Sequence, residues 1–254
     1  MPGTPVADDL FAVLLIFTRI GGALMLMPGI GEPYISARSR LLFALMLSIV
    51  LAAPLAAALP PLPTRFGELA MLIAGEAILG LFIGTAARMM FAVLHIAGST
   101  IAVQSGLATA SVFDPNQSTQ GTLPGNFLTT TAMVLLFATE GHHLILRGLA
   151  ASYGHFRAGD ALPVNDMAMF MTGIVQKSFD LGIQIAAPLL LVGMLTNLAM
   201  GVLNRLMPSF QVFFIALPLQ LLLAFSTLML CFAGGLWVFF TYFDAEYGAL
   251  TLGG

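Results

Sequence analysis

Six ionisable side chains occur within or near strongly apolar stretches of this sequence: Arg19, Glu76, Arg88, His95, Lys177 and Asp180. An unpaired charge in an apolar medium costs several kcal/mol, so each of them should face protein or water. Lys177 and Asp180 are three residues apart, which allows them to neutralise each other on one helical face. At each of the six positions, the fold must therefore supply either a compensating side chain or contact with water.

Glu76 and Arg88 are twelve residues apart in one apolar stretch, a little over three helical turns. We expect them to share a face of the helix without touching, so each needs a partner on another helix or another chain. Three interpretations are open: a structural pair between helices, an ion or proton path, and a contact between subunits.

Enzymatic chemistry has little support among the remaining polar residues. His142 and His143 are adjacent, and they lack the i, i+4 spacing of a helical zinc site. Gln104-Ser105-Gly106 stands near His95, but no G-x-S-x-G motif is present and the later apolar stretches 167–204 and 208–243 carry no histidine that could act as base. No phosphate-binding G-x-x-x-x-G-K-[ST] or G-x-G-x-x-G motif occurs. The sequence predicts a non-enzymatic protein with no cofactor and no metal.

Composition restricts the class of protein further. Of the 254 residues, 59% are hydrophobic and only 8% are charged, with a mean hydropathy of +0.97. An average soluble domain carries about 25% charged residues, so this chain could not cover a water-exposed surface. The net charge of −3 offers no attraction to nucleic acid, and a single cysteine, Cys231, excludes an intramolecular disulfide framework. A multi-span integral membrane protein remains.

Six apolar stretches are long enough for membrane helices, which need roughly 20 residues each: 10–30, 41–59, 68–98, 127–147, 167–204 and 208–243. They predict an all-α membrane protein of about six long hydrophobic helices arranged as hairpins, with kinks at Pro188 and Pro218. We expect one membrane domain over 1–254, in which 1–147 form a four-helix part and 148–254 a C-terminal helical hairpin.

The positions of the arginines do not fit six regular crossings. Arg38 and Arg40 place the first loop in the cytoplasm by the positive-inside rule. Six spans would then leave Arg147 and Arg157 outside and the arginine-free segment 99–126 inside. We infer that one span is re-entrant, or that these helices do not cross the bilayer in the ordinary way.

Small residues form two stripes at helical spacing. Gly80 and Gly84 make a G-x-x-x-G face, and Gly193, Asn197 and Gly201 repeat the spacing with an amide at the centre. Such faces let helix backbones approach closely in a membrane. The stripes predict close packing, either within this chain or against another subunit.

A polar segment, residues 106–121, separates the third and fourth apolar stretches. It is bounded by Gly106 and Gly121 and is uncharged except for Asp114. Asp114-Pro115, next to Phe113, should fix a local turn. Non-helical backbone at membrane depth is tolerated only where it is buried in protein or lines a water-filled cavity. The segment is therefore either an exposed interfacial loop or a loop that lines or blocks a pore.

Around these motifs the sequence resembles the FliR/SctT family of type III secretion export-gate subunits, from the first apolar stretch to about Phe243. The resemblance rests on the order and spacing of Pro28-Gly29-Ile30-Gly31, Arg38 and Arg40, Glu76 with Gly80 and Gly84, Ala97-Gly98, Gln104-x-Gly106, Asp114-Pro115, Gly141-His142, Ser152-Tyr153, Asn197, Gly201 through Asn204-Arg205 to Pro208, Val212-Phe213 and Pro218.

This resemblance implies a pore-forming subunit of the flagellar protein export gate, with the corresponding virulence secretion gate as the alternative and a stand-alone secondary transporter as a more distant one. It implies a multi-pass location in the bacterial inner membrane, in the flagellar basal body. The implied partners are FliP-, FliQ- and FlhB-type subunits, unfolded exported proteins in transit and membrane lipid, but no nucleic acid. The first part would be FliP-like, the last hairpin FliQ-like, and the loop 106–121 a pore plug.

Overall fold

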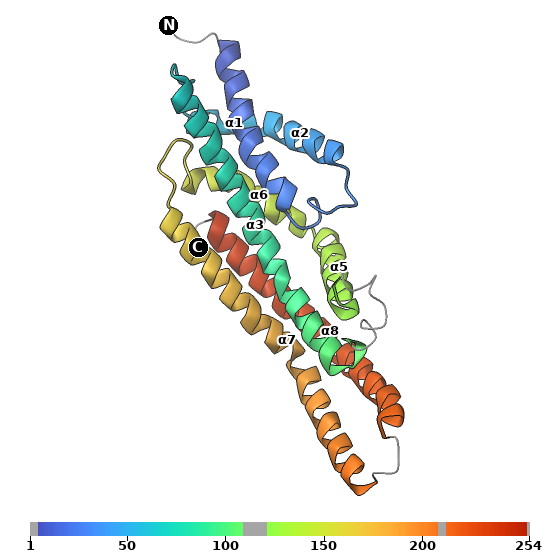
Figure 1. The fold of residues 1–254 in the computed structure, drawn as a ribbon. Coiled ribbons are helices and arrows are strands. Elements are labelled where there is room, and N and C mark those ends of the chain that lie inside the picture. Colours follow the sequence, from blue (N-terminus) through green and yellow to red (C-terminus); the bar gives the residue numbers. More distant parts are fainter. Residues whose placement is uncertain (1–4, 109–120, 208–211, 253–254) are drawn as a thin grey trace. The chain divides into compact units, whose positions relative to one another are not determined.

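The computed structural model describes residues 5–108, 121–207 and 212–252. This part of the chain contains α-helices and one short 3-10 turn, and no β-strand, which confirms the all-α prediction (Figure 1). The α-helices are α1 (Pro5–Leu26), α2 (Ala37–Leu55), α3 (Phe66–Gln104), α5 (Leu123–Ala138), α6 (Gly141–His155), α7 (Val164–Leu206) and α8 (Val212–Leu252).

Five of these helices, α1, α2, α3, α7 and α8, are long and apolar enough to cross a membrane. The expected fourth span over 127–147 is wrong, because the chain breaks there into α5 and α6. Glu140 stands at the break with a φ of 60°, in the left-handed region that a continuous helix cannot contain. The sequence carries a signal of this break, because the polar run Thr139-Glu140-Gly141-His142-His143 interrupts the apolar pattern between the two short helices.

Three helices are much longer than a bilayer requires. Helices α3, α7 and α8 contain 39, 43 and 41 residues, which at 1.5 Å per residue correspond to about 58, 64 and 62 Å. The hydrocarbon core of a bilayer is about 30 Å thick. A large part of each helix must therefore be covered by something other than acyl chains.

A tight turn joins α1 to α2. Gly29 has a φ of 86°, and a Cβ on Gly31 would lie 2.6 Å from the carbonyl oxygen of Met25. Ser36 then caps α2, because its hydroxyl accepts a hydrogen bond from the backbone N–H of Ser39 at 3.2 Å. The glycines and the serine that the sequence places between the first two apolar stretches thus fix where α1 ends and α2 begins.

The chain forms two compact units. The first comprises 1–90, 136–174 and 244–254, and the second comprises 91–135 and 175–243. The predicted division into a FliP-like part (1–147) and a FliQ-like part (148–254) concerns likeness to other subunits and stays a prediction.

Helices α1 and α3 pack closely in the first unit (Figure 1). A Cβ on Gly80 would overlap the backbone carbonyl of Arg19, and one on Gly84 would lie 2.5 Å from the carbonyl oxygen of Ala23. On α1, a Cβ on Gly22 would meet the carbonyl oxygen of Ala77 at 3.4 Å. The Gly80/Gly84 stripe therefore provides the backbone contact between two helices of the same chain.

The second unit is built around the C-terminal part of α3. A Cβ on Gly98 would overlap the backbone of Gly125 in α5. The Phe91 ring makes edge-to-face contacts with Phe239 and Phe243 of α8, with ring centroids 5.0 and 5.6 Å away. Glycine contacts and aromatic packing together hold α5 and α8 against this end of α3.

We predict that Gly84→Leu will prevent α1 from packing on α3, because the new side chain needs space that the Ala23 carbonyl occupies. Overpacking of this kind costs about 1–3 kcal/mol or more. The amount of monodisperse protein extracted from membranes should fall. Gly75→Leu on the same helix is the matched control, since a Cβ there meets no atom within 4 Å. Equal yields from the two variants would contradict the prediction.

Candidate functional site

A buried ion pair joins α1 and α3. The Arg19 Nε donates to Glu76 Oε2 at 2.7 Å, and its Nη2 donates to Glu76 Oε1 at 2.9 Å. Arg19 is fully buried and Glu76 is 1% exposed. This two-point geometry is the strongest that arginine and a carboxylate can form. The position of Glu76 agrees with the first of the three interpretations, a structural pair between helices of one chain.

The same guanidinium also holds the C-terminal end of α6. Arg19 Nη1 donates to Ser152 Oγ at 3.3 Å, and Nη2 donates to the carbonyl oxygen of Phe156 at 2.8 Å. The Ser152 hydroxyl donates in turn to the carbonyl oxygen of Leu149 at 2.7 Å. One side chain thereby links α1, α3 and the end of α6.

Tyr153 completes this buried site. The guanidinium carbon of Arg19 lies 3.8 Å from the centre of the Tyr153 ring, a cation–π contact in a place that water does not reach. Burial is the main reason that the pKa of the Tyr153 phenol is raised far above its ordinary value. The phenol therefore stays neutral at physiological pH. With every charge compensated, the site is suited to holding helices together rather than to catalysis.

Arg88 does not share a face with Glu76, and that expectation is wrong. Glu76 is buried, whereas Arg88 is exposed and forms no ion pair with any residue that the structure describes. Twelve residues at 100° per residue leave a rotation of about 120° between the two side chains. The partner of Glu76 is Arg19, 57 residues away in the sequence.

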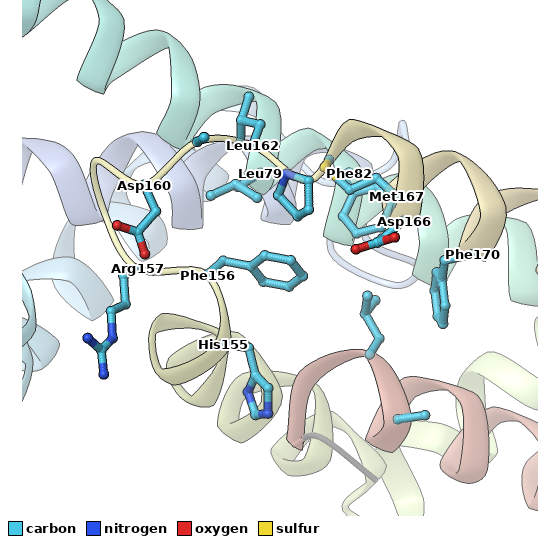
Figure 2. A pocket seen from close by; sticks show the side chains of 14 residues that line it. Leu79, Phe82, His155, Phe156, Arg157, Asp160, Leu162, Asp166, Met167 and Phe170 are labelled. Carbon is cyan, nitrogen blue, oxygen red and sulfur yellow. The ribbon is translucent and has the colours of Figure 1, made fainter.

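A cavity of about 440 Å³ lies in the first unit, beside this ion-pair site (Figure 2). Phe82 belongs to its lining and makes edge-to-face contacts with Phe156 and Phe170, with ring centroids 6.4 and 6.1 Å away. Arg157 and Asp160 belong to its lining and are exposed. Phe156 therefore belongs both to the cavity wall and, through its carbonyl group, to the Arg19 site.

The described ends of the predicted plug loop both have glycine in the left-handed conformation. Gly106 has a φ of 79° and Gly121 a φ of 82°, a backbone shape that other residues adopt only with strain. A Cβ on Gly121 would also lie 2.8 Å from Cε1 of His95. Phe113, Asp114 and Pro115 lie outside the described residues, so the role of the loop stays a prediction.

The second small-residue stripe divides into a buried and an exposed part. Gly193 is buried, and a Cβ there would lie 2.6 Å from Oε1 of Gln104 at the end of α3. The rest of the predicted set on α7 is exposed, namely Asn197, Gly201, Asn204 and Arg205, and Pro208 lies outside the described residues. Gly193 thus packs within the chain, while the exposed part is available to another subunit.

The histidines considered for metal or acid–base chemistry and the Lys177/Asp180 pair take no part in the hydrogen bonds of the buried site. His142 stacks on Phe137 with ring centroids 5.3 Å apart, and His143 lies 3.6 Å from Glu140 at the break between α5 and α6. Lys177 and Asp180 are both exposed on α7. Among the described residues, no group of three or more potential ligands could hold a metal ion.

Sequence reasoning missed the roles of Ser152 and Tyr153 in this site. In the sequence, Ser152-Tyr153 belongs to the family resemblance and carries no chemical motif of its own. Both stand 133 or more residues after Arg19, so no local pattern links them to it. A signal was present, since an arginine inside an apolar stretch needs partners from elsewhere in the chain.

We predict that Glu76→Leu and Arg19→Leu will each destabilise the protein by about 3–5 kcal/mol, because each leaves one buried charge without its partner. The double variant should be more stable than either single variant, since it leaves no unpaired charge. Thermal unfolding of the detergent-extracted protein measures this difference. Glu68→Gln, in the exposed Arg65–Glu68 pair with its 3.8 Å separation, is the control and should change little. Additive losses in the double variant would count against the pairing.

Comparison with known proteins places this arrangement in a family. The family model described as "Bacterial export proteins, family 1" matches residues 10–245. The flagellar biosynthetic protein FliR of Caulobacter vibrioides is 37% identical over 228 residues, which are 90% of this chain and 91% of the relative. FliR of Bacillus subtilis is 33% identical over 228 residues, 88% of this chain and 87% of the relative.

A relative from a secretion system matches less of the chain. The secretion system apparatus protein SsaT of Salmonella typhimurium is 27% identical over 162 residues, 63% of this chain and 62% of the relative. The family consists of export-gate membrane proteins and not of enzymes. With its family-model match over almost the entire sequence and its five long apolar helices, this chain belongs to the bacterial export proteins, family 1.

Proposed function

We propose that this chain is a pore-forming subunit of the flagellar type III protein export gate and serves flagellum assembly by letting unfolded proteins cross the inner membrane. The flagellar relatives align over a larger share of the chain than the secretion-system relative does, which favours a flagellar role. Family membership in protein export also weighs against a stand-alone transporter.

The observation that carries this proposal is the uncovered surface of α7. Large apolar side chains are exposed along its whole length, from Val164 to Leu206, and Leu195 in its C-terminal half is 68% exposed. A helix of 43 residues is about 64 Å long, roughly twice the thickness of the hydrocarbon core. Lipid alone cannot cover such a face, so protein neighbours must cover the remainder.

FliP-, FliQ- and FlhB-type subunits are the neighbours that we propose. Small and amide side chains on the exposed face of α7, Asn197 and Gly201, allow close helix approach and hydrogen bonding without a hydrophobic driving force. Native mass spectrometry of the detergent-extracted protein tests the assembly. We expect a hetero-oligomer, and a lone chain or homodimer would overturn the proposal.

The loop 106–121 is the proposed seal of the closed pore. Its left-handed glycines at both described ends permit sharp changes of chain direction, and its near absence of charge would let diverse unfolded chains pass without strong binding. A passing chain would displace the loop, and energy for export would come from the proton motive force and a separate ATPase.

We predict that deletion of residues 110–118 will leave the assembly intact and let small ions leak across the membrane at rest, because the seal is gone. Growth and membrane potential of cells that produce the variant measure the leak, and recovery of the complex by affinity purification is the control for assembly. A deletion variant that assembles normally and does not leak would show that this loop is not the seal.

Asn204-Arg205 at the exposed C-terminal end of α7 is the proposed contact with a neighbouring subunit. A cation there complements the helix dipole by roughly 0.3–1 kcal/mol, which is too little to make Arg205 essential for folding. We therefore predict that Arg205→Ala will lower export of flagellar proteins more than it lowers the amount of the protein. Secreted flagellin and membrane-bound protein are the two quantities to compare. A parallel fall of both would indicate misfolding instead.

A further inference from the structure

The C-terminal end of α3 is held by a side chain from a distant part of the sequence. Helix α3 ends at Gln104, and the amide nitrogen of Gln220 in α8 donates to the Gln104 carbonyl oxygen at 2.7 Å. The two residues are 116 positions apart. The last four carbonyl groups of any helix have no partner within that helix. Gln220 therefore supplies a hydrogen-bond donor for one of these carbonyl groups at the end of α3.

This hydrogen bond lies in a protected environment. Gln220 is 7% exposed, although it stands on an apolar helix two residues after Pro218. An unpaired carbonyl group in such surroundings is costly, and so is an unpaired amide group. Each of the two groups therefore compensates the other, and loss of the Gln220 amide would leave the Gln104 carbonyl without this partner.

Helix α7 contributes to the same junction. Gly193 is buried against Gln104, and a Cβ on Gly193 would lie 2.6 Å from Oε1 and 3.0 Å from Cβ of that side chain. Gly193, Gln104 and Gln220 also line one small internal space, together with Ser105 and Thr196. The C-terminal end of α3 thus meets interior positions of α7 and α8 at one junction inside the second unit.

The chain turns at this junction. Gly106, two residues after Gln104, has the left-handed φ of 79° that ends a helix. A Cβ on Gly106 would point at Leu217 Cδ2 at 3.5 Å and at the Gln220 side chain at 3.9 Å. The segment that begins at Gly106 therefore starts directly against α8, beside the residue that holds α3.

We propose that Gln220 is a positioning residue, which holds the end of α3 against α8 and thereby fixes where the segment after Gly106 starts. The inference rests on the proposed function only where it connects this position to the resting seal. The placement of the α3 end itself is a separate claim, and it can be tested without any assumption about export.

The direct test is thiol accessibility just after the turn. Leu107 is half-buried, and Leu107→Cys in a Cys231→Ser background gives this chain a single cysteine, whose labelling is followed on this subunit within the assembled complex. Gln220→Met keeps the length and apolar body of the side chain and removes the donor. We expect the rate of modification by a maleimide to rise roughly two- to tenfold, the factor that corresponds to the net contribution of one hydrogen bond.

Gln184→Met is the matched control, because Gln184 belongs to the same unit and is exposed on α7. It should leave the labelling rate unchanged. Gly193→Ala is the second test, since the added methyl group must displace the Gln104 side chain and should raise the rate even if Gln220→Met accumulates poorly. An unchanged labelling rate in a Gln220→Met complex recovered at the normal amount would overturn the inference.

Ion leak at rest separates this inference from the proposed function. We expect Gln220→Met to leak less than the 110–118 deletion but more than Gln184→Met, with equal amounts of complex. If the 110–118 deletion leaks ions and Gln220→Met leaks no more than Gln184→Met, Gln220 has no role in the seal, and the plug is retained. Faster labelling without leak in either variant would retain the positioning of α3 and reject the plug.

Discussion

The first unit depends on one constraint, the need to compensate a fully buried arginine. Arg19 could not remain inside an apolar helix pair without Glu76, and the guanidinium has further donors that Ser152 and the Phe156 carbonyl accept. These contacts determine the rotation of α1 about its axis and the place where α6 ends. Replacing one partner leaves a charge behind, so the elements that meet at Arg19 are energetically coupled.

Close approach of the helix backbones is the second requirement, and it makes the compensation of Arg19 possible. The guanidinium can reach Glu76 in this geometry because Gly80 and Gly84 allow α1 to lie directly on α3. In a bilayer, apolar side chains gain little from leaving lipid for protein, so packing and hydrogen bonds must hold the helices. The same logic recurs in the second unit, where Gly193 admits Gln104 and Gln220 completes the end of α3.

The apolar surface of α7 that these contacts leave exposed makes the chain suited to an assembly. The hydrogen bonds and glycine contacts described above involve α3 and short parts of α7 and α8, while apolar side chains remain exposed from Val164 to Leu206 on α7. A monomer has no means of covering a face about 64 Å long. Neighbouring subunits would cover it, and the family is one of export proteins.

The sequence by itself determined the membrane class, the all-α fold and most of the long helices, because hydropathy and proline or glycine punctuation are local properties of the chain. It also indicated that Glu76 needs a partner and that Gly80 and Gly84 form a packing face. Only the tertiary structure decided that Arg19 is that partner, that Arg88 points elsewhere and that the fourth apolar stretch breaks at Glu140. The physical reason is the large separation of these partners in the sequence. A charge in an apolar helix needs compensation, but the partners of Arg19 stand 57 and 133 residues away from it. Gln220 and Gln104 are likewise 116 residues apart. Such pairings are selected by how helices pack, and no local pattern of residues encodes them.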